Sequence, residues 1–236
     1  MAQHTLTLPS GEDLHYQLER RARRTVGLKI TANGLVIHAP ARILHTQLEK
    51  IILEKAGWIQ TKLAVLQANQ QPAFAWKNGE TLILLGQKYT LALVEERRTS
   101  LALLENRLQL AAPQIHNEQW VARKILTWYQ QTARADFARR LEIFSAKLGV
   151  KTPQLFLSNA KTRWGSCNNK REIRLNWRLI QAPPALINYV VCHELAHLKE
   201  MNHSKKFWQV VEQLCPDYVA SEKGLKQISP QLHRVG

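Results

Sequence analysis

The chain has 236 residues, of which 45% are hydrophobic, so it can bury a substantial core in one large domain or two small ones. It shows neither the roughly 18 uninterrupted apolar residues of a membrane helix nor a secretory signal, and its three cysteines are widely spaced; we therefore expect a soluble, cytoplasmic protein without membrane partners. The net charge of +15 allows a nucleic acid or nucleotide partner, although a solvated basic surface explains it equally well.

The first third of the chain predicts strands followed by a helix. Two apolar runs in residues 28–37 flank Asn33-Gly34, a pair favoured in tight type I′ turns, and this pattern predicts a β-hairpin. Thr46 and Glu49 then form a capping-box signature, after which apolar residues recur at helical spacing. The polar residues 67–72 predict a linker or loop.

The rest of the chain alternates strand and helix patterns. Leu-rich runs between residues 81 and 110 predict a small antiparallel sheet, and residues 117–148 show a long helical pattern that Gly149 ends. Short strands are expected at 155–158 and 172–176. Three further helices are expected to begin near Pro183, Ser204 and Val219. We therefore predict an α+β protein, with an N-terminal α+β region at residues 1–112 and a catalytic domain at residues 113–236.

An H-E-x-x-H motif, His193-Glu194-Leu195-Ala196-His197, lies inside an apolar run that predicts a buried helix. Residues four apart on a helix lie one turn above each other, so His193 and His197 can bind one metal ion. Glu194 lies about 100° around the helix, where it can act as the base for a metal-bound water. The alternative is an ordinary helix whose two histidines bond to backbone or water.

A third metal ligand is expected shortly after this helix. Met201-Asn202 suits a turn, and Ser204 can cap a following helix at residues 205–214, so His203 stands between two helices. Three imidazoles would leave the fourth position of a tetrahedral zinc ion open, as in catalytic sites. Glu212 is the rival third ligand.

Residues 193–207 closely resemble the YgjP-like metallopeptidase domain, and SprT-like zinc proteases are more distant relatives. The segments 163–167 (RWGSC) and 175–179 (LNWRL) resemble this family as well. The resemblance implies a zincin-like C-terminal domain with an H-E-x-x-H active-site helix. It also implies that the strand at 171–176 runs along the cleft and pairs with an extended peptide, although an ordinary interior strand explains the same pattern equally well.

The same resemblance implies one Zn²⁺ held by His193, His197 and His203, with Glu194 as the catalytic base. Glu200 stands where the metzincin motif has a glycine, and no Met-turn follows, which argues against the metzincins proper. A second donor should stabilise the oxyanion of the reaction. The candidates for this or another substrate contact are Arg163, Asn176 and Tyr218.

The leading functional hypothesis is a zinc metallopeptidase that acts on polypeptides. The first alternative is a metal-dependent nucleoside triphosphate pyrophosphohydrolase, which has less support because no Gly-rich phosphate loop or acidic magnesium cluster is evident. The second is a nucleic-acid-binding module that keeps the metal fold for stability. A basic patch that could serve such partners is expected at Arg20, Arg21, Arg23 and Arg24.

Overall fold

Two units make up the computed structural model, residues 1–72 and residues 73–236, and each is described by itself. The structure describes all residues except 1, 9–10, 12, 32–33, 69–73 and 236. Both units combine helices with β-sheet, which confirms the α+β class. The sequence suggested a boundary after residue 112, whereas the division falls after residue 72, because the sheet of residues 81–111 shares the core of the second unit.

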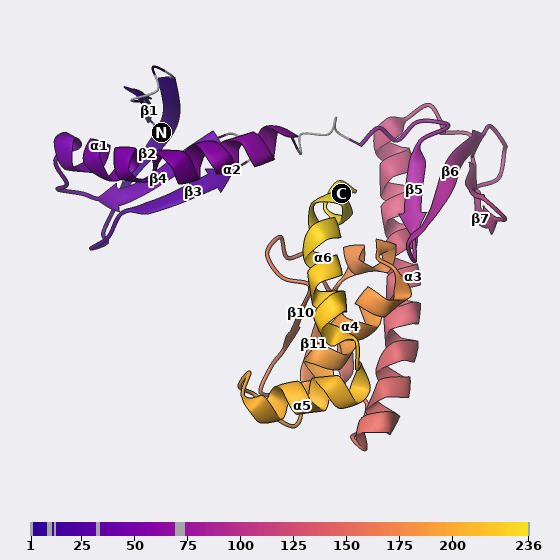
Figure 1. The fold of residues 1–236 in the computed structure, drawn as a ribbon. Helices are drawn as coiled ribbons and strands as arrows, with labels where there is room; N and C mark the ends of the chain where they lie inside the picture. The colour runs from indigo at the N-terminus through magenta and orange to yellow at the C-terminus, as the bar shows by residue number, and fades with distance from the viewer. Residues whose placement is uncertain (1, 9–10, 12, 32–33, 69–73, 236) are drawn as a thin grey trace. The chain divides into compact units, whose positions relative to one another are not determined.

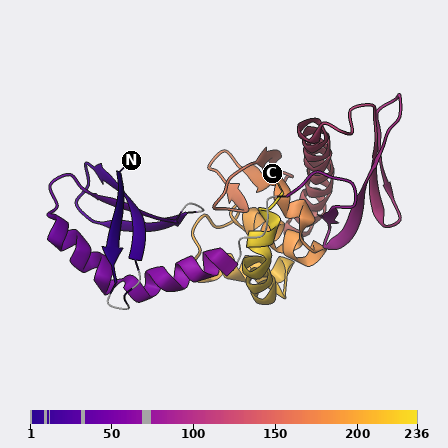
Figure 2. The same cartoon turned by 90° about the horizontal axis from the view of Figure 1, so that it is seen from above.

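The first unit is a four-stranded sheet with two helices along one face, as Figure 1 and Figure 2 both show. Its elements are β1 (Ala2–Thr7), β2 (Asp13–Arg21), β3 (Gly27–Thr31), β4 (Gly34–Pro40), α1 (His45–Glu54) and α2 (Ala56–Ala68). The strand order is β1-β2-β4-β3, with β2 and β4 parallel. Leu48, Ile52 and Ile59 of the helices are fully buried in one core with Leu35 and Ile37 of β4.

The first unit confirms one expectation from the sequence and corrects two others. The antiparallel pair β3–β4 confirms the hairpin, whereas Asn33 of its turn lies outside the described residues. The single expected helix is instead two helices that meet at Lys55. The capping box of Thr46 and Glu49 is wrong, because α1 begins after Leu44 and no side chain caps it.

The strands β1 and β2 were not expected from the sequence. Of the four arginines in the expected basic patch, three are exposed and Arg23 is half-buried. Residues 69–72, which make up most of the expected linker, lie outside the part of the chain that the structure describes.

The second unit contains two sheets and four α-helices among its described residues (Figure 1). Its first elements are β5 (Thr81–Leu84), β6 (Gln87–Val94), β7 (Ser100–Leu104), β8 (Arg107–Ala111) and α3 (Glu118–Leu148). They are followed by β9 (Gln154–Ser158), β10 (Gly165–Cys167), β11 (Glu172–Asn176), the 3₁₀-helix η1 (Trp177–Gln181), α4 (Pro184–Ala196), α5 (Lys205–Leu214) and α6 (Tyr218–Leu232). The expected later strands and helices are thus confirmed to within a few residues.

The long helix α3 joins the first of these sheets to the rest of the unit. Asn117 caps its start by accepting a hydrogen bond from the Trp120 N–H, and Gly149 ends it in the left-handed conformation. The sheet order is β5-β6-β8-β7, and β6 pairs with β8 in parallel, so the expectation of a purely antiparallel sheet is wrong. Tyr129 of α3 is fully buried and donates a 2.8 Å hydrogen bond to the Ile83 carbonyl of β5.

The second sheet has the order β10-β11-β9 and packs beside α4. Because β11 lies between β10 and β9, both of its edges are paired. The expectation that residues 171–176 offer an edge to a peptide is therefore wrong, and the edge strands of this sheet are β10 and β9. Within the described residues, no helix is long and apolar enough to cross a membrane.

Candidate metal centre

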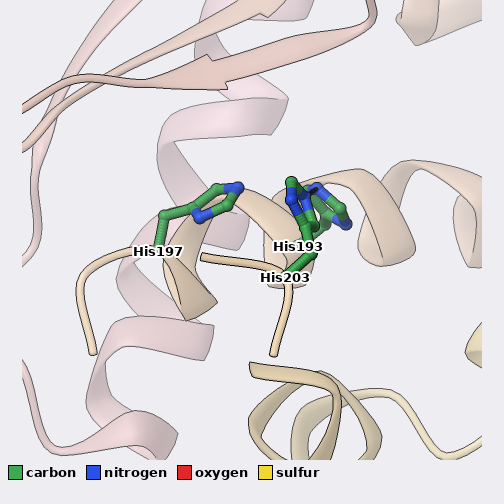
Figure 3. A group of neighbouring side chains, drawn as sticks. All are labelled: His193, His197 and His203. Atoms are coloured by element: carbon green, nitrogen blue, oxygen red, sulfur yellow. Dashed lines mark hydrogen bonds between the residues drawn. The ribbon is translucent and has the colours of Figure 1, made fainter. Parts of the chain in front are cut away.

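Three histidine side chains from neighbouring segments converge in the second unit. His193 lies in the last turn of α4, His197 is the C-cap residue of that helix, and His203 lies in the loop that leads to α5. One ring nitrogen of each histidine lies within 4.8 Å of the other two. Figure 3 shows His193 and His203 close together, with His197 reaching toward them from the opposite side. The fold thus gathers the three predicted ligands, and this cluster does not include the exposed Glu212.

The helix that follows the cluster, α5, packs against it. As predicted from the sequence, α5 begins at Lys205, and the Ser204 hydroxyl caps it by accepting a hydrogen bond from the Phe207 N–H. The Phe207 ring is fully buried, and its centroid lies 4.6 Å from those of His197 and His203. The buried Phe207 ring therefore packs against the imidazoles of the cluster, with His193 at 5.0 Å as the third.

The spacing of two of the imidazoles matches that of ligands on a tetrahedral metal ion. The Nε2 atoms of His193 and His203 are 3.2 Å apart. Two ligands of zinc are separated by about 3.3 Å when each Zn–N distance is about 2.0–2.1 Å. The Nδ1 atom of His197 lies 3.3 Å from the Glu200 carbonyl oxygen, so Nδ1–H can donate to that oxygen and leave Nε2 for a metal. The residues present therefore fit the metal that the donor set implies.

Burial also keeps two of these imidazoles in the form that binds metals. It lowers the pKa of His193 to about 4, with further contributions from the neighbouring His197 and His203. Burial lowers the pKa of His197 as well. A neutral imidazole coordinates a metal, whereas a protonated one does not. At neutral pH these two side chains hold a lone pair ready for coordination.

Glu194 lies on α4 against strand β10 and is only 5% exposed. A Cβ atom at Gly165 would overlap its carboxylate, so this close approach requires a glycine in the strand. Burial raises the pKa of Glu194 to about 8, and the positive charge of Arg163 opposes that rise. Gly165 was not among the predicted site residues, although it stands within the segment 163–167 that resembles the family.

The other predicted substrate contacts lie in different surroundings. Arg163 is exposed and acts on Glu194 through its charge. Asn176 is fully buried: its Nδ2 donates to the Ala160 carbonyl, and its Oδ1 accepts from the Arg178 N–H. Tyr218 stacks on Trp208, with ring centroids 5.2 Å apart. The polar groups of Asn176 are thus engaged within the fold rather than directed at a substrate.

A cavity of about 260 Å³ opens beside His193 and Glu194. Its apolar walls are formed by Trp164, Tyr189, Val190 and Leu225. Trp164 is held in place by a 3.0 Å hydrogen bond from its Nε1 to the Ser229 hydroxyl of α6. Helix α6 therefore shapes one side of the space next to the histidine cluster.

Comparison with known protein families supports the resemblance noted in the sequence. The model of the YgjP-like metallopeptidase domain matches residues 24–228, which is most of the chain and includes the histidine cluster. The chain belongs to the YgjP-like family. Another relative of this YgjP-like chain is the UTP pyrophosphatase of Escherichia coli K12, which is 33% identical over 102 residues. That match covers 40% of the YgjP-like chain and 61% of the length of the relative.

Two solved structures are similar to part of the YgjP-like chain. The metallopeptidase zymogen abylysin of Pyrococcus abyssi has a TM-score of 0.37 and 25% identity, covering 42% of this chain and 96% of its own. The metallopeptidase zymogen jannalysin of Methanocaldococcus jannaschii has a TM-score of 0.35 and 22% identity, covering 40% and 96% respectively.

Proposed function

We propose that this YgjP-like protein is a zinc-dependent hydrolase, with a peptide bond as its first candidate substrate. The observation that carries the proposal is the convergence of His193, His197 and His203 beside the buried carboxyl group of Glu194. The family description, a metallopeptidase domain, supports the same reaction class. Three neutral imidazoles are a donor set typical of catalytic zinc.

In the proposed reaction the metal ion would activate the water and the carbonyl group, and protein side chains would transfer the protons. Zinc bound by the three imidazoles would lower the pKa of a water molecule and polarise the scissile carbonyl. Glu194 accepts the proton of the attacking water at its carboxylate and returns a proton to the leaving amine. Its burial favours this role, because a pKa of about 8, close to the pH of the reaction, suits a group that both takes up and gives back a proton. Arg163 limits that rise and so keeps a share of the carboxyl ionised.

Strand β10 offers a backbone edge on which a peptide could bind. Ser166 pairs with Arg174 of β11, and the flanking hydrogen bonds join Asn176 N–H to the Trp164 carbonyl and Asn168 N–H to the Glu172 carbonyl. In an antiparallel pair, the residues between such bonds turn their backbone groups outward.

The outward groups belong to Gly165 and Cys167, and within the described part of the chain they have no strand partner. Gly165 also touches Glu194. A peptide added at this edge would therefore lie next to the proposed base.

The test is hydrolysis of a denatured protein by the zinc-loaded chain, compared with Glu194→Gln at equal zinc content. We expect cleavage by the wild type and a loss of at least about 10²-fold in the variant, which lacks the base. Equal cleavage by both proteins would refute the role of Glu194. No cleavage of any denatured protein or peptide would refute the peptidase assignment.

The second candidate function is hydrolysis of a nucleoside triphosphate to a monophosphate and pyrophosphate. It is favoured by the 33% identical relative that is named a UTP pyrophosphatase and by the net charge of +15. The zinc-loaded protein is incubated with UTP, and pyrophosphate release is measured. Release that Glu194→Gln abolishes, without peptide cleavage, would replace the first candidate by the second.

A further inference from the structure

A second cavity, of about 310 Å³, lies on the other flank of the histidine cluster, where His197 lines it. Its walls include Arg171 and Lys199, together with the amide side chains of Asn168 and Asn169. Among the residues that the structure describes, no acidic side chain lines it. The two cavities therefore differ in charge: Glu194, Glu222 and Lys226 line the first, whereas the second is lined by the cations Arg171 and Lys199.

Arg171 is held at this cavity by an unusual backbone conformation. Its φ angle is +61°, in the left-handed region that residues other than glycine rarely adopt. The turn between β10 and β11 imposes this angle: the Arg171 N–H donates to the Asn168 carbonyl at 2.9 Å. The Asn168 side chain in turn accepts from the N–H groups of Lys170 and Glu172, both at 3.0 Å. Such strain persists where the surrounding contacts enforce it, and it is concentrated at functional sites.

The charges of Arg171 and Lys199 are not neutralised within the described residues, where neither forms an ion pair. The acidic residue next to Arg171, Glu172, is engaged by the Asn168 amide at 2.8 Å and by Arg174 at 3.7 Å. Glu200, which follows Lys199, does not line this cavity. The cavity beside Glu194 differs in this respect, because its Lys226 pairs with Glu222 at 2.7 Å. The His197 flank of the centre therefore carries two cations that are available to an incoming anion.

We propose that Arg171 and Lys199 form a subsite for an anionic group of the substrate on the His197 side of the metal centre. The anion is a carboxylate or a phosphate: the acidic side chain of a peptide in the first candidate function, or the phosphate chain of a nucleotide in the second. This inference rests on the proposed function only in placing a substrate across the three histidines. Arg171 supplies a planar fork suited to two oxygens, and Lys199 supplies a point charge.

The experiment measures binding without turnover, so that it stays separate from the hydrolysis assays. Zinc-loaded Glu194→Gln protein is titrated with inorganic pyrophosphate, with a Glu-containing peptide and with the same peptide carrying Gln. The test variant adds Arg171→Gln and Lys199→Gln. The matched control instead adds Arg123→Gln and Arg134→Gln, two exposed arginines of α3 that also remove two charges. Zinc content and circular dichroism check that each variant is folded.

We expect at least one anionic probe to bind about tenfold more weakly to the test variant than to the control, whereas the Gln peptide binds equally to both. A variant that carries Arg171→Lys instead of Arg171→Gln keeps the positive charge and should recover part of the affinity. A loss confined to pyrophosphate identifies the phosphate, and a loss confined to the Glu peptide identifies the carboxylate. Equal binding of both anions to the test and control variants, or no binding of either anion to the parent protein, would overturn the proposal.

Discussion

Gly165 of β10 and Glu194 of α4 are in contact, and the strand can approach the carboxylate only because residue 165 has no side chain. This contact buries the proposed base and sets its distance from the strand edge. Gly165, which has no side chain, thus helps to position Glu194, the group proposed to accept the proton of the attacking water.

Gly165→Ala should therefore impair catalysis more than folding. The added methyl group overlaps the Glu194 carboxylate, so either the side chain or the strand has to move. We expect at least a tenfold loss in kcat at unchanged zinc content, and destabilisation of about 1–3 kcal/mol from overpacking. Hydrolysis rates, metal analysis and urea denaturation measure the three quantities. Full activity in Gly165→Ala would show that the position of Glu194 does not matter.

Substitution of a true metal ligand should remove the zinc, whereas substitution of Glu212 should not. His193→Ala, His197→Ala and His203→Ala should each lose both zinc and activity, because two imidazoles hold the ion far more weakly than three. Glu212→Ala should retain zinc, since Glu212 is exposed and does not belong to the cluster. Metal analysis after dialysis against a weak chelator gives the readout. Retention of zinc by His203→Ala together with its loss from Glu212→Ala would reverse the assignment of the third ligand.

Cys192 should resist alkylation in the folded protein. Burial raises its pKa to about 12, and its side chain is fully buried in the core. At pH 8 iodoacetamide should therefore modify the half-buried Cys167 and Cys215 first, and Cys192 only after addition of urea. Intact-mass spectrometry counts the modified thiols. Rapid modification of all three cysteines under native conditions would contradict the packing of α4.

The same shift has a consequence for stability at alkaline pH. In the unfolded chain the Cys192 thiol ionises near its ordinary pKa of about 8.5, whereas in the folded chain it stays protonated. The stabilising contribution of the neutral thiol is therefore complete below about pH 8.5 and is lost as the pH rises toward 12. Cys192→Ala should remove this part of the pH dependence, which urea denaturation at pH 7 and pH 10 can measure.

Tyr129→Phe should destabilise the second unit without affecting the metal centre. The variant removes the hydroxyl that donates to the Ile83 carbonyl, which links α3 to the sheet of β5. We expect a loss of about 1–2 kcal/mol in the free energy of unfolding, the size of one buried hydrogen bond. Zinc content and hydrolysis at 25 °C should remain at the wild-type level. A stability change below about 0.3 kcal/mol would show that the hydroxyl group is satisfied equally well in the unfolded chain.

Local patterns in the sequence determined much of the second unit. The helix that Gly149 ends, the Ser204 cap and the 3.6-residue repeat of α5 are encoded by neighbouring residues, so they were predicted correctly. The H-E-x-x-H spacing likewise places His193 and His197 on one helical face whatever the rest of the chain does. The break between α1 and α2 at Lys55 was missed, although Gly57 follows two residues later, because an isolated glycine is also tolerated within a helical pattern.

Only the tertiary structure decided which strand forms the edge beside the site. β10 and β11 are close in the sequence, but β11 lies in the middle of the sheet because it also pairs with β9. β9 precedes β10 in the chain, so this pairing joins segments that are not neighbours in the sequence. The same long-range packing brings Gly165 against Glu194, His203 against His193, and Arg171 to the cavity beside His197. Residue types and local spacing therefore determined which groups could bind a metal, whereas contacts between distant segments decided what surrounds them, because sheet pairing and side-chain burial depend on the whole unit.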